Sequence, residues 1–412
     1  MEKLLNLQDQ YKFPMGQLIY EQESAAEVTF AMTNRKALTG MPIREYIRPE
    51  ELQEYYDSLR DLAFSDEELA ILERQTDKRY TDQYLGYLAS FRLPAINVFV
   101  DQWNGDITAE TTARWNAASL WEIPMLSAIP ELYYPRYIEA HGGSMSQVWN
   151  EGDRRLTQMI ELMRAHPEIK FAEFGTRRRF SSEWQDHAVE RFTTECPESL
   201  IGTSNPWLAD KYNIPASGTN AHELGMTYAA LAEARGGNPL DGQHRVVTDW
   251  LERFPTMPVA LIDTFTSDIT LHDLTPEDID RIKSFRIDSG DERKIGNKVI
   301  AFLERHHVDP LSRTLFFSNS LTPQKVVDLS NEFRGEIGVA FGIGGNAVNN
   351  MGFDASHDLP GMNIVSKAVK VDGHGTVKLS DDEGKHMGHP DDVERYQHYA
   401  NERLGGISRS AA

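Results

Sequence analysis

The sequence predicts an α/β protein in which an irregular, TIM-like α/β-barrel domain is combined with a second, mixed α+β domain from the N-terminal region. From about residue 168 onward, short apolar segments alternate with helical segments, a pattern typical of a parallel sheet. Distinctive polar residues directly follow these segments, as expected at the C-terminal rim of a barrel. The predicted strands are residues 170–174, 200–202, 259–263, 284–288, 314–317 and 337–341.

The predicted domain boundaries lie at residues 135 and 360. Residues 1–135 form the mixed N-terminal domain, 136–360 the barrel domain, and 361–412 a C-terminal hairpin and tail. An open doubly wound sheet would also fit the alternation. However, no Gly-x-Gly-x-x-Gly motif follows the first strand.

The N-terminal region mixes helices and strands. Ser65 and Glu68 form the signature of a capping box, which predicts a helix beginning there. Residues 93–100 and 108–113 are predicted as antiparallel strands joined by the turn Asn104-Gly105. A helix is predicted to begin within residues 121–128, at the end of this region.

In the barrel region, two helices have clear beginnings at Thr275-Pro276 and Thr322-Pro323, because threonine caps a helix and proline suits its first position. Residues 363–371 and 376–380, separated by the turn 372–375, are predicted to form a β-hairpin.

Composition narrows the functional class. The 412 residues suggest two domains, and the net charge of −21 disfavours binding to nucleic acid or to an anionic membrane. We find no apolar run long enough to span a membrane and no secretory signal, so we expect a cytoplasmic protein. The single cysteine, Cys196, excludes an intrachain disulfide. Thirteen histidines could suggest metal binding, but His306, His307, His374, His386 and His389 lie in polar stretches without a strict ligand spacing.

A basic run at residues 174–180 follows the first barrel strand. Its adjacent arginines cannot all face one ligand, so we expect one or two, Arg177 and Arg178, to reach the oxygens of an anion such as phosphate. Another is expected to pair with an acid such as Glu173 or Glu183.

A glycine-rich loop, residues 341–346, follows the last predicted strand. Gly342, Gly344 and Gly345 allow backbone amides to approach a phosphate closely. A tight turn between strand and helix is the structural alternative.

Carboxylates end two other strands. Asp288, with Arg286 before it, and Asp263 could accept hydrogen bonds from a sugar, hold Mg²⁺ through water, or offset positive charge on a ribose. The alternative for Asp288 is a capped turn.

His222 lies at a predicted helix start, with Asn220 as N-cap and Glu223 at the third helical position. A neutral imidazole there is poised as a nucleophile, and the helix dipole favours a phosphate placed on it. A structural role is the alternative for a lone histidine.

Taken in order, these motifs resemble those of the nicotinate phosphoribosyltransferase family. The resemblance runs from Tyr11-Lys12 to the segment 378–385 and includes residues 173–181, 202–205, 288–291, 317–319 and 363–365. It implies a type II phosphoribosyltransferase fold, a homodimer, and the substrates nicotinate and phosphoribosyl pyrophosphate. It also implies ATP hydrolysis coupled through a phosphohistidine, with Mg²⁺.

The resemblance assigns roles to individual residues. It makes His222 the phosphorylated histidine, Asp288 the carboxylate that faces the ribose, Tyr11 the contact of the nicotinate ring, and Arg177 a contact of substrate and pyrophosphate. Arg286, two residues before Asp288, is predicted as a further catalytic residue. The remaining predicted substrate contacts are Arg178, Thr219, Ser318, Gly342, Gly344 and Gly345, and Asp288 and Asp263 are the predicted water-mediated metal ligands.

The chain departs from the family pattern at three places: Leu7-Gln8-Asp9 keeps only the second acid of the opening motif, and Gly345 and Asn319 replace a usual threonine and aspartate. Preference among pyridine bases is therefore open, and a nicotinamide-using enzyme of the same fold is the main alternative. A phosphosugar aldolase or isomerase would need a strand-end lysine or glutamate base, and none is evident. A non-catalytic relative would be expected to lose His222 or Asp288.

Overall fold

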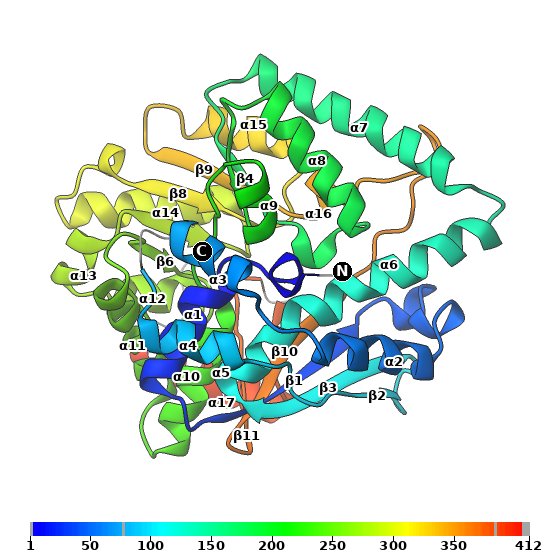
Figure 1. The fold of residues 1–412 in the computed structure, drawn as a ribbon. Coiled ribbons are helices and arrows are strands. Elements are labelled where there is room, and N and C mark those ends of the chain that lie inside the picture. The colour runs from blue at the N-terminus through cyan, green and yellow to red at the C-terminus, as the bar shows by residue number, and fades with distance from the viewer. Residues whose placement is uncertain (1–2, 76–78, 383–384, 406–412) are drawn as a thin grey trace. The chain divides into compact units, whose positions relative to one another are not determined.

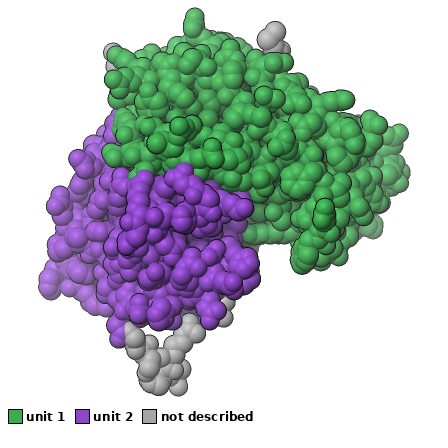
Figure 2. Space-filling view, turned by 90° about the horizontal axis from the view of Figure 1, so that it is seen from below, with its two compact units in different colours: residues 1–218, 320–325, 342–367 green, residues 219–319, 326–341, 368–412 purple. Residues whose placement is uncertain are grey.

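The computed structural model describes residues 3–75, 79–382 and 385–405. The chain forms two compact units (Figures 1 and 2). The first comprises residues 1–218, 320–325 and 342–367, and the second residues 219–319, 326–341 and 368–412 (green and purple in Figure 2). Residues 406–412, at the end of the predicted tail, lie outside the described residues, and the domain boundaries at 135 and 360 stay predictions.

A parallel sheet contains all six strands predicted for the barrel, so the α/β fold class is confirmed. Its strand order is β5-β4-β9-β8-β7-β6. Pairing is in parallel register, for example Phe285↔Leu315 and Phe316↔Ala340. The strands are β4 (Phe171–Glu173), β5 (Leu200–Thr203), β6 (Val259–Leu261), β7 (Ser284–Ile287), β8 (Thr314–Phe317) and β9 (Gly338–Ile343).

An antiparallel sheet has the order β11-β10-β1-β3-β2. The predicted strand pair near the N-terminus is confirmed, because β2 and β3 pair antiparallel from Asn97↔Glu110 to Val100↔Ile107. The strands are β1 (Glu27–Asn34), β2 (Asn97–Val100), β3 (Ile107–Arg114), β10 (Ile364–Val371) and β11 (His374–Gly375).

The helices of the first unit begin where the sequence predicts in two clear cases. Ser65 and Glu68 form reciprocal hydrogen bonds before α3, and α6 begins at Glu122. The helices are α1 (Lys12–Gln22), α2 (Pro49–Arg60), α3 (Asp66–Gln75), α4 (Asp82–Ser90), α5 (Trp115–Ala118), α6 (Glu122–Ala140), α7 (Met145–Ala165), α8 (Ser182–Glu195), α9 (Pro206–Lys211) and α16 (Gly345–Val348). Short 3₁₀ helices are η1 (Leu4–Leu7), η2 (Ala37–Thr39), η3 (Ile43–Glu45), η4 (Ser119–Trp121) and η5 (Thr176–Arg178).

In the second unit, Thr275 and Asp278 form a complete capping box at α13, and α15 begins at the predicted proline, Pro323. The helices are α10 (His222–Ala234), α11 (Pro239–Arg253), α12 (Ser267–Asp273), α13 (Pro276–Arg281), α14 (Glu292–Arg305), α15 (Pro323–Glu332, which begins in the first unit), α17 (Pro390–Arg403) and the 3₁₀ helix η6 (Pro310–Ser312). None of the helices in the described residues is both long and apolar enough to cross a bilayer.

The predicted hairpin is only partly correct. β10 turns into β11, but β11 contains two residues, and residues 376–380 do not continue it as a strand. Instead, the backbone amides of Leu379 and Ser380 donate to the carbonyl oxygen of Thr264, at 3.0 and 3.2 Å. Val377 and Leu379 lie in a buried apolar cluster with Phe265 and Tyr396. Burial of these two side chains therefore draws the segment away from its hairpin partner.

Cys196 caps the C-terminus of α8 and is buried. Burial raises the pKa of its thiol to about 12, so at neutral pH the group behaves as a small apolar side chain.

Candidate active site

His222 lies at the centre of a buried cluster in the second unit, which we call the histidine cluster: His222, Asp263, Thr264, Asp288 and Lys378. Nδ1 of His222 lies 3.0 Å from Oγ1 of Thr264. Nε2 lies 3.1 Å from Oδ2 of Asp288 and 3.0 Å from Nζ of Lys378. The imidazole is thus held from both of its nitrogens.

The sheet explains why these residues meet. Asp263 and Thr264 follow β6, Asp288 follows β7, and Ser318 follows β8. Because parallel strands end at the same edge, their following residues converge there. The expectation that Asp263 lines the same rim as Asp288 is confirmed, since the backbone amide of Asp288 lies 3.4 Å from Oδ1 of Asp263.

The predicted cap of the histidine helix is wrong. α10 begins at His222, its N-cap is Ala221, and no side chain caps it. The carbonyl oxygen of Asn220 instead accepts a hydrogen bond from Arg286 at 2.7 Å. His222 is therefore the first helical residue, and Arg286 ties the loop before it to β7.

Opposing charges act on the cluster. Burial, and then Lys378, lower the pKa of His222, against the opposite effect of Asp263 and Asp288. For Asp288, burial would raise the pKa, but Arg286, His222 and Lys378 hold it well below its usual range. At neutral pH the histidine is thus neutral and the aspartate ionised.

Arg286 and Ser318 fix the other oxygen of Asp288. Oγ of Ser318 donates to Oδ1 of Asp288 at 2.5 Å, and Nη2 of Arg286 lies 3.4 Å from the same atom. Nε of Arg286 also donates to Ser318. These predicted site residues therefore act on one carboxylate and fix its orientation.

A second cluster lies in the first unit, and we call it the glutamate cluster: Tyr11, Lys12, Glu122, Arg177 and Lys367. Glu122 and Lys12 are buried, and the other three residues are half-buried. Glu122 Oε2 lies 2.6 Å from Lys12 Nζ and accepts from the Tyr11 hydroxyl at 3.0 Å. Glu122 Oε1 lies 3.0 Å from Arg177 Nη1 and 3.8 Å from Lys367 Nζ. The predicted residues Tyr11 and Arg177 are thus brought together by an acid that sequence reasoning missed.

Cations dominate around Glu122. Burial would raise the pKa of its carboxyl, but Lys12, Lys367 and Arg177 hold it well below its ordinary value. The carboxylate is ionised at every physiological pH. Its surroundings are suited to an anionic group beside the Tyr11 ring.

The glycine-rich loop packs against the arginine run within the first unit. Gly342 is part of β9, which extends two residues beyond the prediction, Gly344 precedes α16, and Gly345 is its first residue. A Cβ at Gly344 would lie 3.2 Å from the Phe174 carbonyl oxygen and 4.0 Å from an Arg178 Nη1 atom. Glycine therefore permits the close approach of the two segments.

The other arginine of the run pairs elsewhere than expected. Arg179 is buried and forms an ion pair with Glu131, at 3.2 Å, instead of with Glu173 or Glu183. Glu173 accepts from Gln185, Thr203 and the amide of Gly175. Burial raises the pKa of Glu173 to about 7 despite these hydrogen bonds.

Thr219, a further predicted contact, lies in the half-buried loop three residues before His222.

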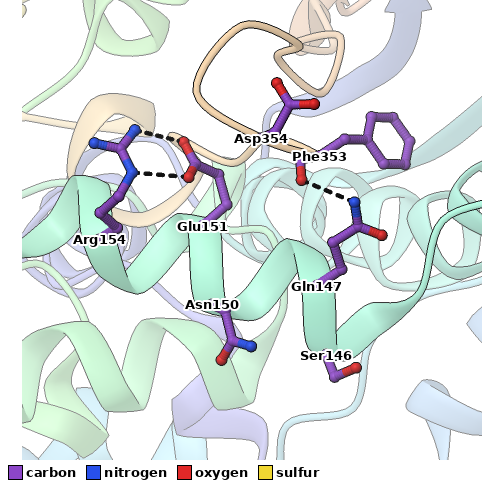
Figure 3. A pocket seen from close by; sticks show the side chains of 7 residues that line it. All are labelled: Ser146, Gln147, Asn150, Glu151, Arg154, Phe353 and Asp354. Atoms are coloured by element: carbon purple, nitrogen blue, oxygen red, sulfur yellow. Dashed lines mark hydrogen bonds and ion pairs between the residues drawn. The ribbon is translucent and has the colours of Figure 1, made fainter.

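A surface depression lies in the first unit, and none of its lining residues is a predicted site residue. It has a volume of about 540 Å³ and lies between α7 and the loop at Phe353 (Figure 3). An ion pair between Glu151 and Arg154 and a hydrogen bond from Gln147 to the Phe353 carbonyl close parts of it. Its lining residues are Ser146, Gln147, Asn150, Glu151, Arg154, Phe353 and Asp354.

Five residues of the two clusters received no site role from the sequence: Thr264 and Lys378 in the histidine cluster, and Lys12, Glu122 and Lys367 in the glutamate cluster. Glu122 could have been recognised as a candidate site residue, because it is an acid within the apolar run Trp121 to Met125. The local sequence around Lys378 gives little indication of its role, because its contact with His222 spans 156 positions of the chain.

Comparison with known proteins decides the family. Residues 169–403 match the model of the nicotinate phosphoribosyltransferase (NAPRTase) family, and residues 7–130 match the model of its N-terminal domain. This chain belongs to the NAPRTase family. It is therefore an enzyme, a nicotinate phosphoribosyltransferase of pyridine nucleotide biosynthesis.

Solved structures support the family from the fold. The nicotinate phosphoribosyltransferase of Porphyromonas gingivalis is 29% identical, with a TM-score of 0.87 over 97% of this chain and 99% of that one. A Saccharomyces cerevisiae protein, provisionally assigned the same activity, is 26% identical, with a TM-score of 0.84 over 98% of each chain. The enzyme of Vibrio cholerae, 24% identical, has a TM-score of 0.86 over 98% of this chain and 96% of that one and shows the shared fold.

Proposed function

We propose that this NAPRTase joins nicotinate to C1 of phosphoribosyl pyrophosphate and couples the reaction to ATP through a phosphohistidine at His222. The observation that supports the coupling is the neutral imidazole of His222, held at both nitrogens and contacted by Lys378. In the phosphorylation step, a nitrogen–phosphorus bond forms on the ring. The bond from the γ-phosphorus to the bridging oxygen breaks, and ADP leaves with the electron pair.

Asp288 is assigned to the glycosyl transfer. Loss of pyrophosphate leaves positive charge on the ribose, and an ionised carboxylate stabilises that charge only in the transition state. Arg286 and Ser318 support this role because both contact Oδ1 of Asp288. We assign Arg286 to orienting this carboxylate.

Nicotinate binding is assigned to the glutamate cluster. The Tyr11 ring offers a stacking surface, and Lys12, Arg177 and Lys367 surround Glu122 with positive charge. A carboxylate ligand is favoured by such surroundings, whereas a neutral amide gains less. Nicotinate is therefore preferred over nicotinamide. Arg178 and residues 342–345 are assigned to the phosphates of phosphoribosyl pyrophosphate.

The strand-end carboxylates supply two of the oxygen-bearing groups that an Mg²⁺ ion would need. Asp288 and Asp263 supply the hard oxygen atoms that Mg²⁺ prefers. Within the described ranges, no group of three or more His, Cys, Asp or Glu side chains forms a ligand set. The two aspartates would therefore hold the ion through water, and the bound ion would offset charge on the pyrophosphate.

We also assign the enzyme to the cytoplasm, on the composition of the sequence, and we assign a homodimer on the family resemblance. The net charge of −21 supports small-molecule substrates over nucleic acid or membrane partners.

The coupling is tested with His222→Asn. Labelled ATP should form an acid-labile, base-stable phosphoenzyme with the unaltered protein and none with the variant. His244→Asn is a matched control, because His244 also pairs with an aspartate, Asp278, at 3.1 Å in the second unit, and it should keep the label. Persistent label in His222→Asn would show that another residue is phosphorylated.

Substrate preference is tested by pyrophosphate release with nicotinate, nicotinamide and quinolinate offered in turn. Nicotinate should be turned over fastest. Equal turnover of nicotinamide would contradict the assignment of the cations to a carboxylate.

A further inference from the structure

The segment of residues 376–382, which we call the strand-end segment, crosses from the end of β6 to the end of β7 in the second unit. Near β6, its amides at Leu379 and Ser380 donate to the Thr264 carbonyl. Near β7, the amide of Asp381 lies 3.4 Å from Oγ of Ser289. The segment is thus fixed at the strand ends that carry the histidine cluster.

The direction of the Lys378 side chain follows from the alternation of side chains along this segment. Its neighbours Val377 and Leu379 are buried in the apolar cluster formed with Phe265, Ile269 and Tyr396. In extended chain, alternate side chains point to opposite sides. The apolar anchors therefore turn Lys378 toward the opposite side, where its Nζ meets Nε2 of His222 at 3.0 Å.

Phosphorylation would change the charge of this site strongly. A phosphoryl group on His222 places negative charge beside Asp288, 3.1 Å from the ring, and Asp263, 3.8 Å from it. In a buried site such like charges repel strongly unless a cation lies among them. Lys378 contacts the ring and also lies 3.7 Å from Asp263.

We propose that Lys378 is a further catalytic residue, whose ammonium group contacts the reacting ring of His222 and stabilises the phosphoryl group during its transfer from ATP. This inference rests on the proposed phosphohistidine. The nitrogen–phosphorus and phosphorus–oxygen bonds change as described above, and the proton on the second ring nitrogen stays in place. Lys378 supplies positive charge beside the ring and takes no part in the bond changes.

The experiment compares Lys378→Met, Lys378→Arg and Lys385→Met. Lys385 is the matched control, because it is a lysine close in the chain whose Nζ contacts Asn319 and Asp382, at 3.2 and 3.3 Å. Phosphoenzyme formation from labelled ATP is timed in each variant, and mononucleotide synthesis without ATP is measured beside it.

Lys378→Met should slow phosphoenzyme formation about 100-fold, the usual effect of removing one charge-stabilising donor. Its loss of ATP-independent synthesis should be much smaller than its loss of phosphorylation, because that reaction transfers no phosphoryl group to His222. Lys378→Arg should recover part of the rate, and Lys385→Met should match the unaltered enzyme.

Near-normal phosphorylation in folded Lys378→Met, or an equal loss in Lys385→Met, would overturn the proposal. If Lys378→Met does not fold, because it leaves Asp263 without this cation, Lys378→Gln keeps a polar group of similar reach without the charge. Label that persists in His222→Asn would refute the phosphohistidine itself. A labelled enzyme that requires His222 but not Lys378 would refute this inference alone.

Discussion

In the first unit, one buried carboxylate, Glu122, is surrounded by cations, whereas in the second unit a neutral histidine lies between two carboxylates, Asp263 and Asp288. Both clusters have a buried, hydrogen-bonded centre, yet their balance of charge differs: three cations surround Glu122, whereas two aspartates and one lysine surround His222. The first suits an anionic ligand, and the second suits positive charge that develops on a substrate. In the proposed reaction, these two environments act on different groups, and each is built on its own elements of the chain.

The largest expected effect concerns Asp288, in the histidine cluster. Asp288→Asn keeps the shape and removes the charge, so kcat should fall about 100- to 1,000-fold while KM changes little. Steady-state kinetics of mononucleotide synthesis measure both constants. The control is Asp280→Asn, an exposed aspartate of α13. A normal kcat with raised KM would reduce Asp288 to a substrate-positioning group.

The proposed role of the glutamate cluster in binding a carboxylate is tested by Arg177→Gln. Loss of this partner of Glu122 should lower kcat/KM for nicotinate by roughly 10- to 100-fold, because a charged hydrogen bond contributes about 1.5–3 kcal/mol. The value for nicotinamide, which has no carboxylate, should fall much less. Arg154→Gln removes another Arg–Glu pair of the first unit and serves as control. Equal losses for both bases would contradict a carboxylate-binding cluster.

A smaller effect is expected at the glycine-rich loop. A valine at Gly344 would crowd the Phe174 carbonyl and the Arg178 guanidinium, so the affinity for phosphoribosyl pyrophosphate should weaken about tenfold, equivalent to about 1.4 kcal/mol. Titration calorimetry measures the binding. Gly361→Val is a suitable control, since no atom lies within 4 Å of the added Cβ. Unchanged affinity would place the phosphates elsewhere.

The smallest effect is on stability and concerns Glu173. Its pKa in the folded enzyme is about 7, above the value of about 4.3 expected in the unfolded chain. Between these values the folded state holds the proton more tightly, so the free energy of unfolding should decrease as pH rises from about 4.3 to 7.

Denaturant titrations across this pH range measure the slope. Glu173→Gln should flatten it, because the variant has no carboxyl group to titrate. Glu151→Gln is the control, since hydrogen bonds from Arg154 and Arg155 lower the pKa of Glu151 to about 2, below the range. An identical slope in Glu173→Gln and the unaltered enzyme would refute the contribution of Glu173.

The predictable part of the molecule is the part encoded locally. Strand-and-helix alternation gave the six parallel strands, and threonine–proline pairs gave the starts of α13 and α15. His222 and Asp288 were chosen as candidate site residues because His222 lies at a predicted helix start and Asp288 at a predicted strand end.

The missed residues depend on tertiary packing. Lys378 reaches His222 only because Val377 and Leu379 are buried in the apolar cluster of the second unit. Asn220 was predicted as N-cap from residue type alone, but Arg286 uses its carbonyl and Ala221 takes the cap position. Such competition between distant partners leaves no trace in a local pattern.

The buried thiol of Cys196 can be used to measure local unfolding at the end of α8. Thiol reagents attack the thiolate, and the raised pKa and burial of this group suppress that form in the folded chain. Alkylation of the native enzyme should therefore report how often the end of α8 opens to solvent. Since the sequence contains a single cysteine, the alkylation rate reports on Cys196 alone, and no engineered label is needed.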